Sequence, residues 1–140
     1  MWQKTVTALL FGALSFVLLG MGFGGQDGGT TAYKKLSAQE AKAIMDSGDP
    51  YVLLDVRTEE ELQELHIKGT ILIPYTEVKS RAASELPNKD AVVLIYCRSG
   101  RRSAIAANDL IKIGYTRVYD FGGINDWPYE IVTGASAAKQ

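Results

Sequence analysis

The sequence predicts an α/β domain built on a five-stranded parallel sheet with helices on both faces. Short apolar runs rich in β-branched residues alternate along the chain with segments typical of helices, which is the pattern of βαβ units with right-handed crossovers. The run Val92–Tyr96 contains no charged residue and is typical of a strand buried on both faces. With 140 residues, 46% of them hydrophobic, the chain is long enough for one globular domain with a core.

The N-terminal segment does not follow this pattern. Residues 5–23 carry no charge and come after a short start that contains Lys4. This run is longer than the usual core of a signal peptide and just long enough to span a bilayer. Residues 1–23 are therefore predicted to be a signal peptide or a membrane anchor, with a buried core helix as the less favoured alternative. The protein is expected to be exported to the periplasm or another extracytoplasmic space, either soluble after cleavage or anchored by residues 5–23.

The Gly-rich residues 24–32 predict a flexible tether, and the folded domain is expected over 33–134 with a tail at 135–140. Ser37 and Thr58 each precede a glutamate by three residues, and this capping box predicts the start of a helix. The resulting prediction has helices at 37–47, 58–65, 76–84 and 103–111, and strands at 33–36, 51–56, 70–73, 92–96 and 117–120.

The single cysteine, Cys97, directly follows the central strand, and Gly100 interrupts the chain before the next helix. Cys97 is therefore expected in a strand-to-helix turn at the carboxyl end of the sheet, where parallel α/β sheets bind ligands. A thiol beside arginines at a helix N-terminus is expected to have a lowered pKa, and the thiolate is the form that attacks and carries sulfur. A buried structural cysteine is the less favoured alternative.

Three arginines, Arg98, Arg101 and Arg102, follow Cys97 within five residues. Cations in or beside the first turn of a helix oppose its dipole unless an anion joins them, so the turn is predicted to bind an anion. The net charge of the whole chain is -1, which argues against a nucleic-acid-binding protein. One cysteine and one histidine do not make a set of ligands with metal-site spacing, so neither a metal nor a cofactor is expected.

The segment Cys97–Ser103, with the sequence CRSGRRS, resembles the active-site loop of the rhodanese (sulfurtransferase) family. In that family the nucleophilic cysteine opens a six-residue loop that an arginine closes. Asp55-Val56-Arg57 with Glu61, and then His66–Pro74, resemble the signatures D-V-R-x-x-x-E and G-H-I-x-G-A-x-x-I-P, except that Leu65 and Thr70 replace a glycine and an alanine. Residues 122–127 resemble a third signature, G-G-x-x-x-W.

The resemblance implies a sulfurtransferase in which the Cys97 thiolate attacks the sulfane sulfur of an anionic donor such as thiosulfate. A persulfide on Cys97 then passes its sulfur to cyanide, to a thiol or to a protein acceptor. The donor and this persulfide are expected to be held by the rest of the loop, with Arg102 serving donor binding and nucleophile activation. These substrate-binding residues are Arg98, Ser99, Gly100, Arg101, Arg102 and Ser103.

Two other functions remain open. One is a carrier module that holds a persulfide or an anion for a partner protein without turnover. The other, less favoured, is a phosphatase or arsenate reductase. The loops of the related dual-specificity phosphatases have one more residue before the arginine, whereas here the sixth residue after Cys97 is Ser103. The chain also has no further cysteine to resolve an intermediate.

Several residues near the predicted site have a structural interpretation as well as a functional one. Asp55 and Arg57 are candidates to line the pocket, but a structural network in which Arg57 pairs with Glu61 is favoured. His66 is a candidate proton shuttle, although a histidine between helix and strand more often fixes a turn through hydrogen bonds. Gly122 and Gly123 are expected to let two backbone segments approach, and Trp127 is expected in the core.

Overall fold

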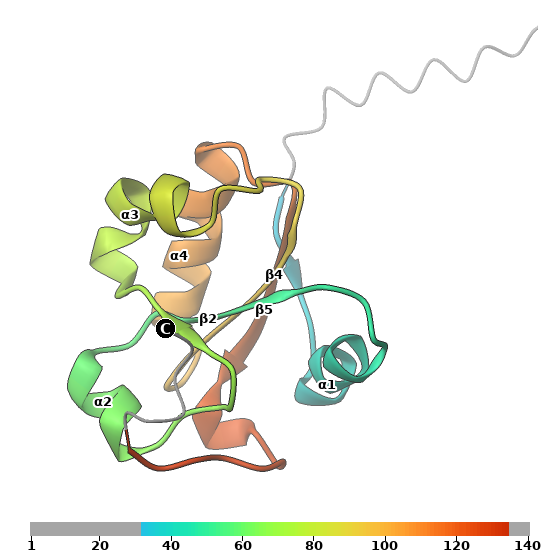
Figure 1. Cartoon of the computed structure of the whole chain (residues 1–140), viewed down its shortest axis with the longest axis vertical. Coiled ribbons are helices and arrows are strands. Elements are labelled where there is room, and N and C mark those ends of the chain that lie inside the picture. The colour runs from blue at the N-terminus through green and yellow to red at the C-terminus, as the bar shows by residue number, and fades with distance from the viewer. Residues whose placement is uncertain (1–31, 135–140) are drawn as a thin grey trace, which may run out of the picture.

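The computed structural model describes residues 32–134, which form a five-stranded sheet with helices packed against it (Figure 1). Every strand pair is parallel, and the strand order is β1-β5-β4-β2-β3. The predicted fold class is confirmed. The strands are β1 (Lys34–Lys35), β2 (Val52–Asp55), β3 (Ile71–Leu72), β4 (Val92–Cys97) and β5 (Arg117–Gly123).

The first two helices begin where the capping boxes predict. Ser37 and Thr58 each accept a hydrogen bond from the backbone N–H three residues on, and the glutamate there accepts one from the N-cap backbone. The remaining elements follow the predicted alternation, with a 3-10 turn before the third helix and another after the last strand. The helical elements are α1 (Ala38–Asp46), α2 (Glu59–Glu64), η1 (Tyr75–Glu77), α3 (Val78–Glu85), α4 (Arg101–Lys112) and η2 (Ile124–Asp126).

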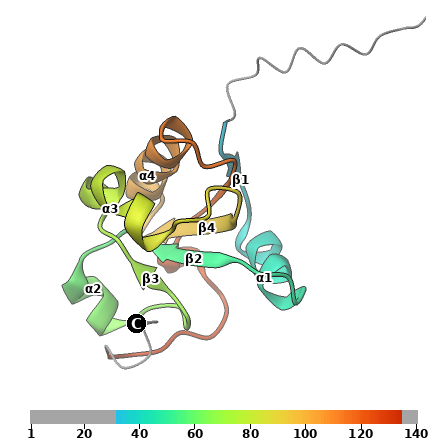
Figure 2. The same cartoon turned by 45° about the horizontal axis from the view of Figure 1, so that its top comes forward.

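The central strand β4 is buried on both faces. Val93, Ile95 and Cys97 belong to a core layer that includes α3 and α4, whereas Leu94 and Tyr96 belong to a second layer that includes α1 and the aromatic residues near the C-terminus. Figures 1 and 2 show α3 and α4 on one side of the sheet and α1 on the other. Because helices cover both faces, the loops at the carboxyl edge are where a ligand site can form.

The element boundaries differ from prediction at the two segments that flank Cys97. Helix α4 begins at Arg101, earlier than the predicted Ser103, because Gly100 adopts a φ of 110° and turns the chain directly into the helix. Strand β5 continues to Gly123 instead of ending at Asp120, because Gly123 pairs with Cys97 after an irregularity in the register. The loop around Cys97 is therefore shorter, and more closely held, than the sequence predicts.

The predictions for residues 1–31 and 135–140 fall outside the described residues. Over 32–134, none of the helices has the length and apolar character needed to cross a membrane.

Candidate active site

The sulfur of Cys97 lies at the carboxyl end of β4, inside the loop that leads into α4. The residue is only 1% exposed. Its sulfur accepts a hydrogen bond from the backbone N–H of Gly100 at 3.0 Å, and the thiol donates one to Oγ of Ser103 at 3.5 Å. The Ser103 hydroxyl is itself fixed, because it donates to the carbonyl of Gly100 at 3.1 Å. The loop therefore folds back around the sulfur, with the Gly100 amide donating to it and the Ser103 hydroxyl in contact with it.

These donors control the ionisation of the thiol. Burial by itself raises the pKa of Cys97, but hydrogen bonds from the Ser103 side chain and from the backbone amides of Ser103, Gly100 and Ser99 act in the opposite direction. The net effect lowers the pKa of the Cys97 thiol below its ordinary value. Convergent amides at a helix N-terminus form an anion site, and here the anion is the thiolate itself.

Strand β5 supports the outside of this loop. A Cβ atom on Gly123 would lie 2.0 Å from the carbonyl oxygen of Arg98 and 2.6 Å from Cα of Ser99, so only glycine fits there. The same carbonyl accepts a hydrogen bond from the backbone N–H of Asn125 at 3.2 Å. The prediction that the glycines let two backbone segments approach is confirmed for Gly123, and the second segment is the active-site loop; Gly122 has open space around it and a φ of 86° instead.

The three arginines of the loop have different environments. Arg102 makes a two-pronged contact with Glu61, with nitrogen–oxygen distances of 2.7 and 2.8 Å, and its side chain is 18% exposed. Arg98 is 58% exposed, and its Nε lies 3.7 Å from Glu61. Arg101 is exposed, and its guanidinium carbon lies 5.9 Å from the ring centre of Tyr75. Arg98 and Arg101 therefore present their charge to solvent, whereas Arg102 is held by a carboxylate.

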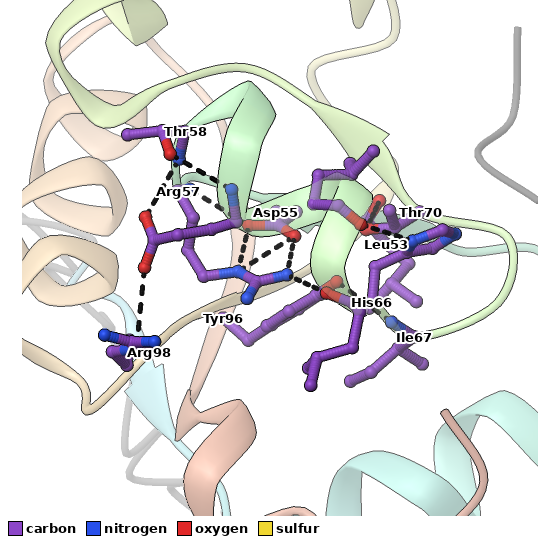
Figure 3. Close-up of polar contacts among 12 residues, drawn as sticks. Leu53, Asp55, Arg57, Thr58, His66, Ile67, Thr70, Tyr96 and Arg98 are labelled. Carbon is purple, nitrogen blue, oxygen red and sulfur yellow. Dashed lines mark hydrogen bonds and ion pairs between the residues drawn. The ribbon is translucent and has the colours of Figure 1, made fainter. Parts of the chain in front are cut away.

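The predicted pairing of Arg57 with Glu61 is wrong. Arg57 binds Asp55, with Nη2 at 2.7 Å from Oδ2, and it also donates to the carbonyl of Leu65 (Figure 3). The side chains are 2% and 0% exposed, so this is a fully buried ion pair. Four-residue spacing places side chains together only on a continuous helix, and Arg57 precedes α2. Because both groups are buried, the structure favours a structural network for Asp55 and Arg57 over a place on an open pocket wall.

His66 is fully buried next to this network. Its Nδ1 lies 2.8 Å from the carbonyl of Leu62, and its backbone pairs with Val132 in both directions at 2.8 Å. These contacts agree with the favoured interpretation that His66 fixes a turn. Trp127 is 8% exposed and lies in the core as predicted.

Sequence reasoning missed two contacts at the mouth of the loop. Nothing in the sequence around Tyr75 indicates a contact with the loop, since an aromatic residue after a proline is common. Glu61 appeared in a signature, but its partner Arg102 is 41 residues away, and no spacing rule reaches that far. Among residues 32–134, no group of three or more His, Cys, Asp or Glu side chains is arranged to hold a metal ion.

Comparison with known proteins agrees with this geometry. The model of the rhodanese-like domain family matches residues 37–129, which is most of the described chain. The chain belongs to the rhodanese-like family. It is 44% identical to the Escherichia coli thiosulfate sulfurtransferase PspE over 73 residues, which covers 52% of this chain and 70% of PspE. It is 39% identical to the putative sulfur carrier protein YrkF of Bacillus subtilis over 94 residues, 66% of this chain but only half of that protein.

Solved structures of family members resemble the fold as well. A rhodanese with anions from E. coli is 40% identical and matches with a TM-score of 0.58, covering 61% of this chain and all of that one. A rhodanese-like domain protein from Staphylococcus aureus is 28% identical, with a TM-score of 0.63 and coverage of 73% and 99%. The family resemblance inferred from the Cys97 loop is thus confirmed.

Proposed function

We propose that this protein is a sulfurtransferase that carries sulfur as a persulfide on Cys97. The observation that carries the proposal is the polar loop around the sulfur, in which the Gly100 amide donates to Cys97, Oγ of Ser103 lies 3.5 Å away, and the pKa of the thiol is lowered. A group that stabilises a thiolate in this way also suits the negative outer sulfur of a persulfide. The likeness to PspE, a thiosulfate sulfurtransferase, supports thiosulfate as the donor.

In the first half-reaction, the Cys97 thiolate attacks the sulfane sulfur of thiosulfate. A new S–S bond forms on Cys97, the sulfur–sulfur bond of thiosulfate breaks, and sulfite leaves with its electron pair. In the second, a nucleophile such as cyanide or a thiolate takes the outer sulfur and returns Cys97 to the thiolate. The cycle is a ping-pong reaction that needs no cofactor.

The donor is an anion, and the exposed arginines are suited to attract it. Arg98 and Arg101 reach solvent beside the loop, and neither is locked to a carboxylate as closely as Arg102 is. Guanidinium groups bind planar or tetrahedral oxyanions through several parallel hydrogen bonds. Thiosulfate is therefore expected to approach with its sulfonate end toward these side chains and its sulfane sulfur toward Cys97.

A second candidate is a carrier that receives sulfur and delivers it only to a partner protein. The likeness to YrkF, a putative sulfur carrier, favours it. The two functions share the persulfide and differ in turnover. Steady thiocyanate production from thiosulfate and cyanide supports the enzyme, whereas a single loading without turnover supports the carrier.

The test is the intact mass of the full chain before and after incubation with thiosulfate, and again after cyanide. We expect a gain of one sulfur, about 32 Da, that cyanide removes and that Cys97→Ser prevents. No gain with thiosulfate or with a persulfide donor contradicts both candidates. Hydrolysis of an aryl phosphate by the same sample would favour the phosphatase alternative.

We also propose that the protein is exported. The uncharged run at residues 5–23 supports this, because such a segment at the start of a chain directs secretion or membrane anchoring. Contact with a membrane is proposed only through this segment.

A further inference from the structure

Glu61 lies between helix α2 and the active-site loop, and its carboxylate contacts both. It accepts a hydrogen bond from the backbone N–H of Thr58 at 3.1 Å, which completes the capping box of α2. It also accepts two from Arg102, at 2.7 and 2.8 Å, and lies 3.7 Å from Nε of Arg98. One carboxylate thus joins the start of α2 to the first turn of α4.

The contact between Glu61 and Arg102 fixes the guanidinium in space. Two parallel hydrogen bonds define the plane of the guanidinium as well as its position. The side chains are 16% and 18% exposed, so water competes only weakly for either partner. The hydrogen bond to Arg102 is the main reason that the pKa of Glu61 is lowered to about 2, which keeps the carboxylate charged at neutral pH.

Arg102 directly precedes Ser103, whose Oγ lies 3.5 Å from the Cys97 sulfur, so both residues belong to the helical turn that faces the thiol. The pKa of Arg102 is raised, first by the hydrogen bond to Glu61, and the charge of the Cys97 thiolate acts in the same direction against the effect of burial. Arg98 and Arg101 differ from Arg102 because they are exposed and have no two-pronged partner. Arg98 and Arg101 are thus free to capture an anion from solvent, whereas Arg102 is held in one position and supplies a fixed charge near the sulfur.

We propose that Glu61 is a positioning residue that holds the Arg102 guanidinium beside the reacting sulfur during transfer. The inference rests on the proposed function. When the thiolate attacks the sulfane sulfur, negative charge moves onto the departing sulfite, and a fixed guanidinium at that place stabilises the transition state without having to reorganise. Arg98 and Arg101 attract the donor, and Arg102 acts on the step that breaks its S–S bond.

The substitution Glu61→Gln isolates this role. Glutamine serves in a capping box as well as glutamate does, so the cap on Thr58 is retained, but the neutral amide cannot accept two charge-assisted hydrogen bonds from Arg102. Persulfide formation on the full chain is followed by rapid quenching and intact mass over a range of thiosulfate concentrations. The maximal rate should fall about tenfold or more, because a small misplacement of a catalytic group is costly, while the half-saturating concentration stays within about twofold.

Two control variants separate positioning from stability. Glu60→Gln removes the same charge from the exposed face of α2 and should leave the rate unchanged. Thr58→Ala removes the side-chain cap of α2 and lowers the stability of the helix without touching Arg102. A rate loss in Thr58→Ala equal to that in Glu61→Gln would show that Glu61 acts only through the helix and would overturn the proposal.

Two further readouts complete the test. In Arg102→Gln, adding Glu61→Gln should cause no further loss, since the residue it positions is gone; additive losses overturn the proposal. In Glu61→Gln the midpoint of Cys97 alkylation by iodoacetamide should stay below that of an ordinary thiol, because loop amides and Ser103 lower the thiol pKa. A midpoint at or above that of an ordinary thiol would mean a distorted loop and would also overturn the proposal. Sulfur loading of wild type and Glu61→Gln at equal rates refutes the inference alone, whereas a wild type that takes up no sulfur refutes the proposed function.

Discussion

Replacing Gly123 with alanine should disable Cys97 without replacing any polar side chain of the site. Gly123 has a φ of -117°, which any residue adopts, so alanine meets no backbone strain there. The obstacle is space, because the added Cβ would lie 2.0 Å from the carbonyl oxygen of Arg98 and 2.5 Å from its carbonyl carbon. The neighbour is backbone, so it cannot rotate away as a flexible side chain would.

The size of the displacement follows from the contact distance. Ordinary van der Waals contact begins near 3.4 Å, so the Arg98–Ser99 peptide must retreat by about 1.4 Å. A movement of this size carried to Gly100 lengthens the 3.0 Å contact between its N–H and the Cys97 sulfur beyond a hydrogen bond. The free energy of unfolding should fall by about 1–3 kcal/mol from overpacking, and persulfide formation should slow about a hundredfold because the sulfur loses its aligned donors.

The assay is the rate of Cys97 alkylation by iodoacetamide as a function of pH, together with sulfur loading from thiosulfate. In wild type the midpoint should lie below that of an ordinary thiol, because the loop donors lower the pKa of Cys97. In Gly123→Ala the midpoint should rise, since burial then opposes ionisation without compensation. Gly48→Ala is the stability control, because Gly48 has a φ of 87° with open space around it and follows α1, away from the loop. Wild-type alkylation and loading in Gly123→Ala would refute the reasoning.

Three further predictions follow from burial and charge. Asp55→Ala should lower the free energy of unfolding in urea by about 3–5 kcal/mol, because it leaves the charge of Arg57 buried without a partner. Asp46→Ala breaks the exposed pair with Lys42 and should cost less than about 1 kcal/mol. Similar losses in the two variants would contradict the structural role of the buried pair. The pKa of Glu61 is lowered from 4.5 to about 2, chiefly by the hydrogen bond to Arg102, so its pairing stabilises the fold fully above pH 4.5 and is lost as the pH falls toward 2. Between pH 4.5 and 2, the free energy of unfolding should therefore fall less in Glu61→Gln than in wild type. Parallel plots of this free energy against pH for the two proteins would argue against the pairing. Cell fractionation should find the full-length or shortened chain outside the cytoplasm, and a chain of unchanged mass in the cytoplasmic fraction would refute export.

Much of the fold could be predicted because short stretches of sequence mark where its helices begin and where its central strand lies. The capping boxes at Ser37 and Thr58 place two helix starts correctly, and the uncharged run before Cys97 marks the central strand. The strand-to-helix turn, and so the position of the thiol at the carboxyl edge, follow from these elements. The pairing of Arg57 was predicted incorrectly because the rule used for it applies within a helix, and Arg57 lies before one.

What the sequence does not reveal is which charges at the loop are free. Three arginines follow Cys97 closely, and by spacing alone each is an equal candidate to bind the donor. The fold separates them, because α2 brings Glu61 to Arg102 while leaving Arg98 and Arg101 exposed. If the three were equivalent, any one of them replaced by glutamine would weaken donor binding to the same degree. The geometry instead leads us to expect Arg101→Gln to raise the half-saturating thiosulfate concentration and Arg102→Gln to lower the maximal rate.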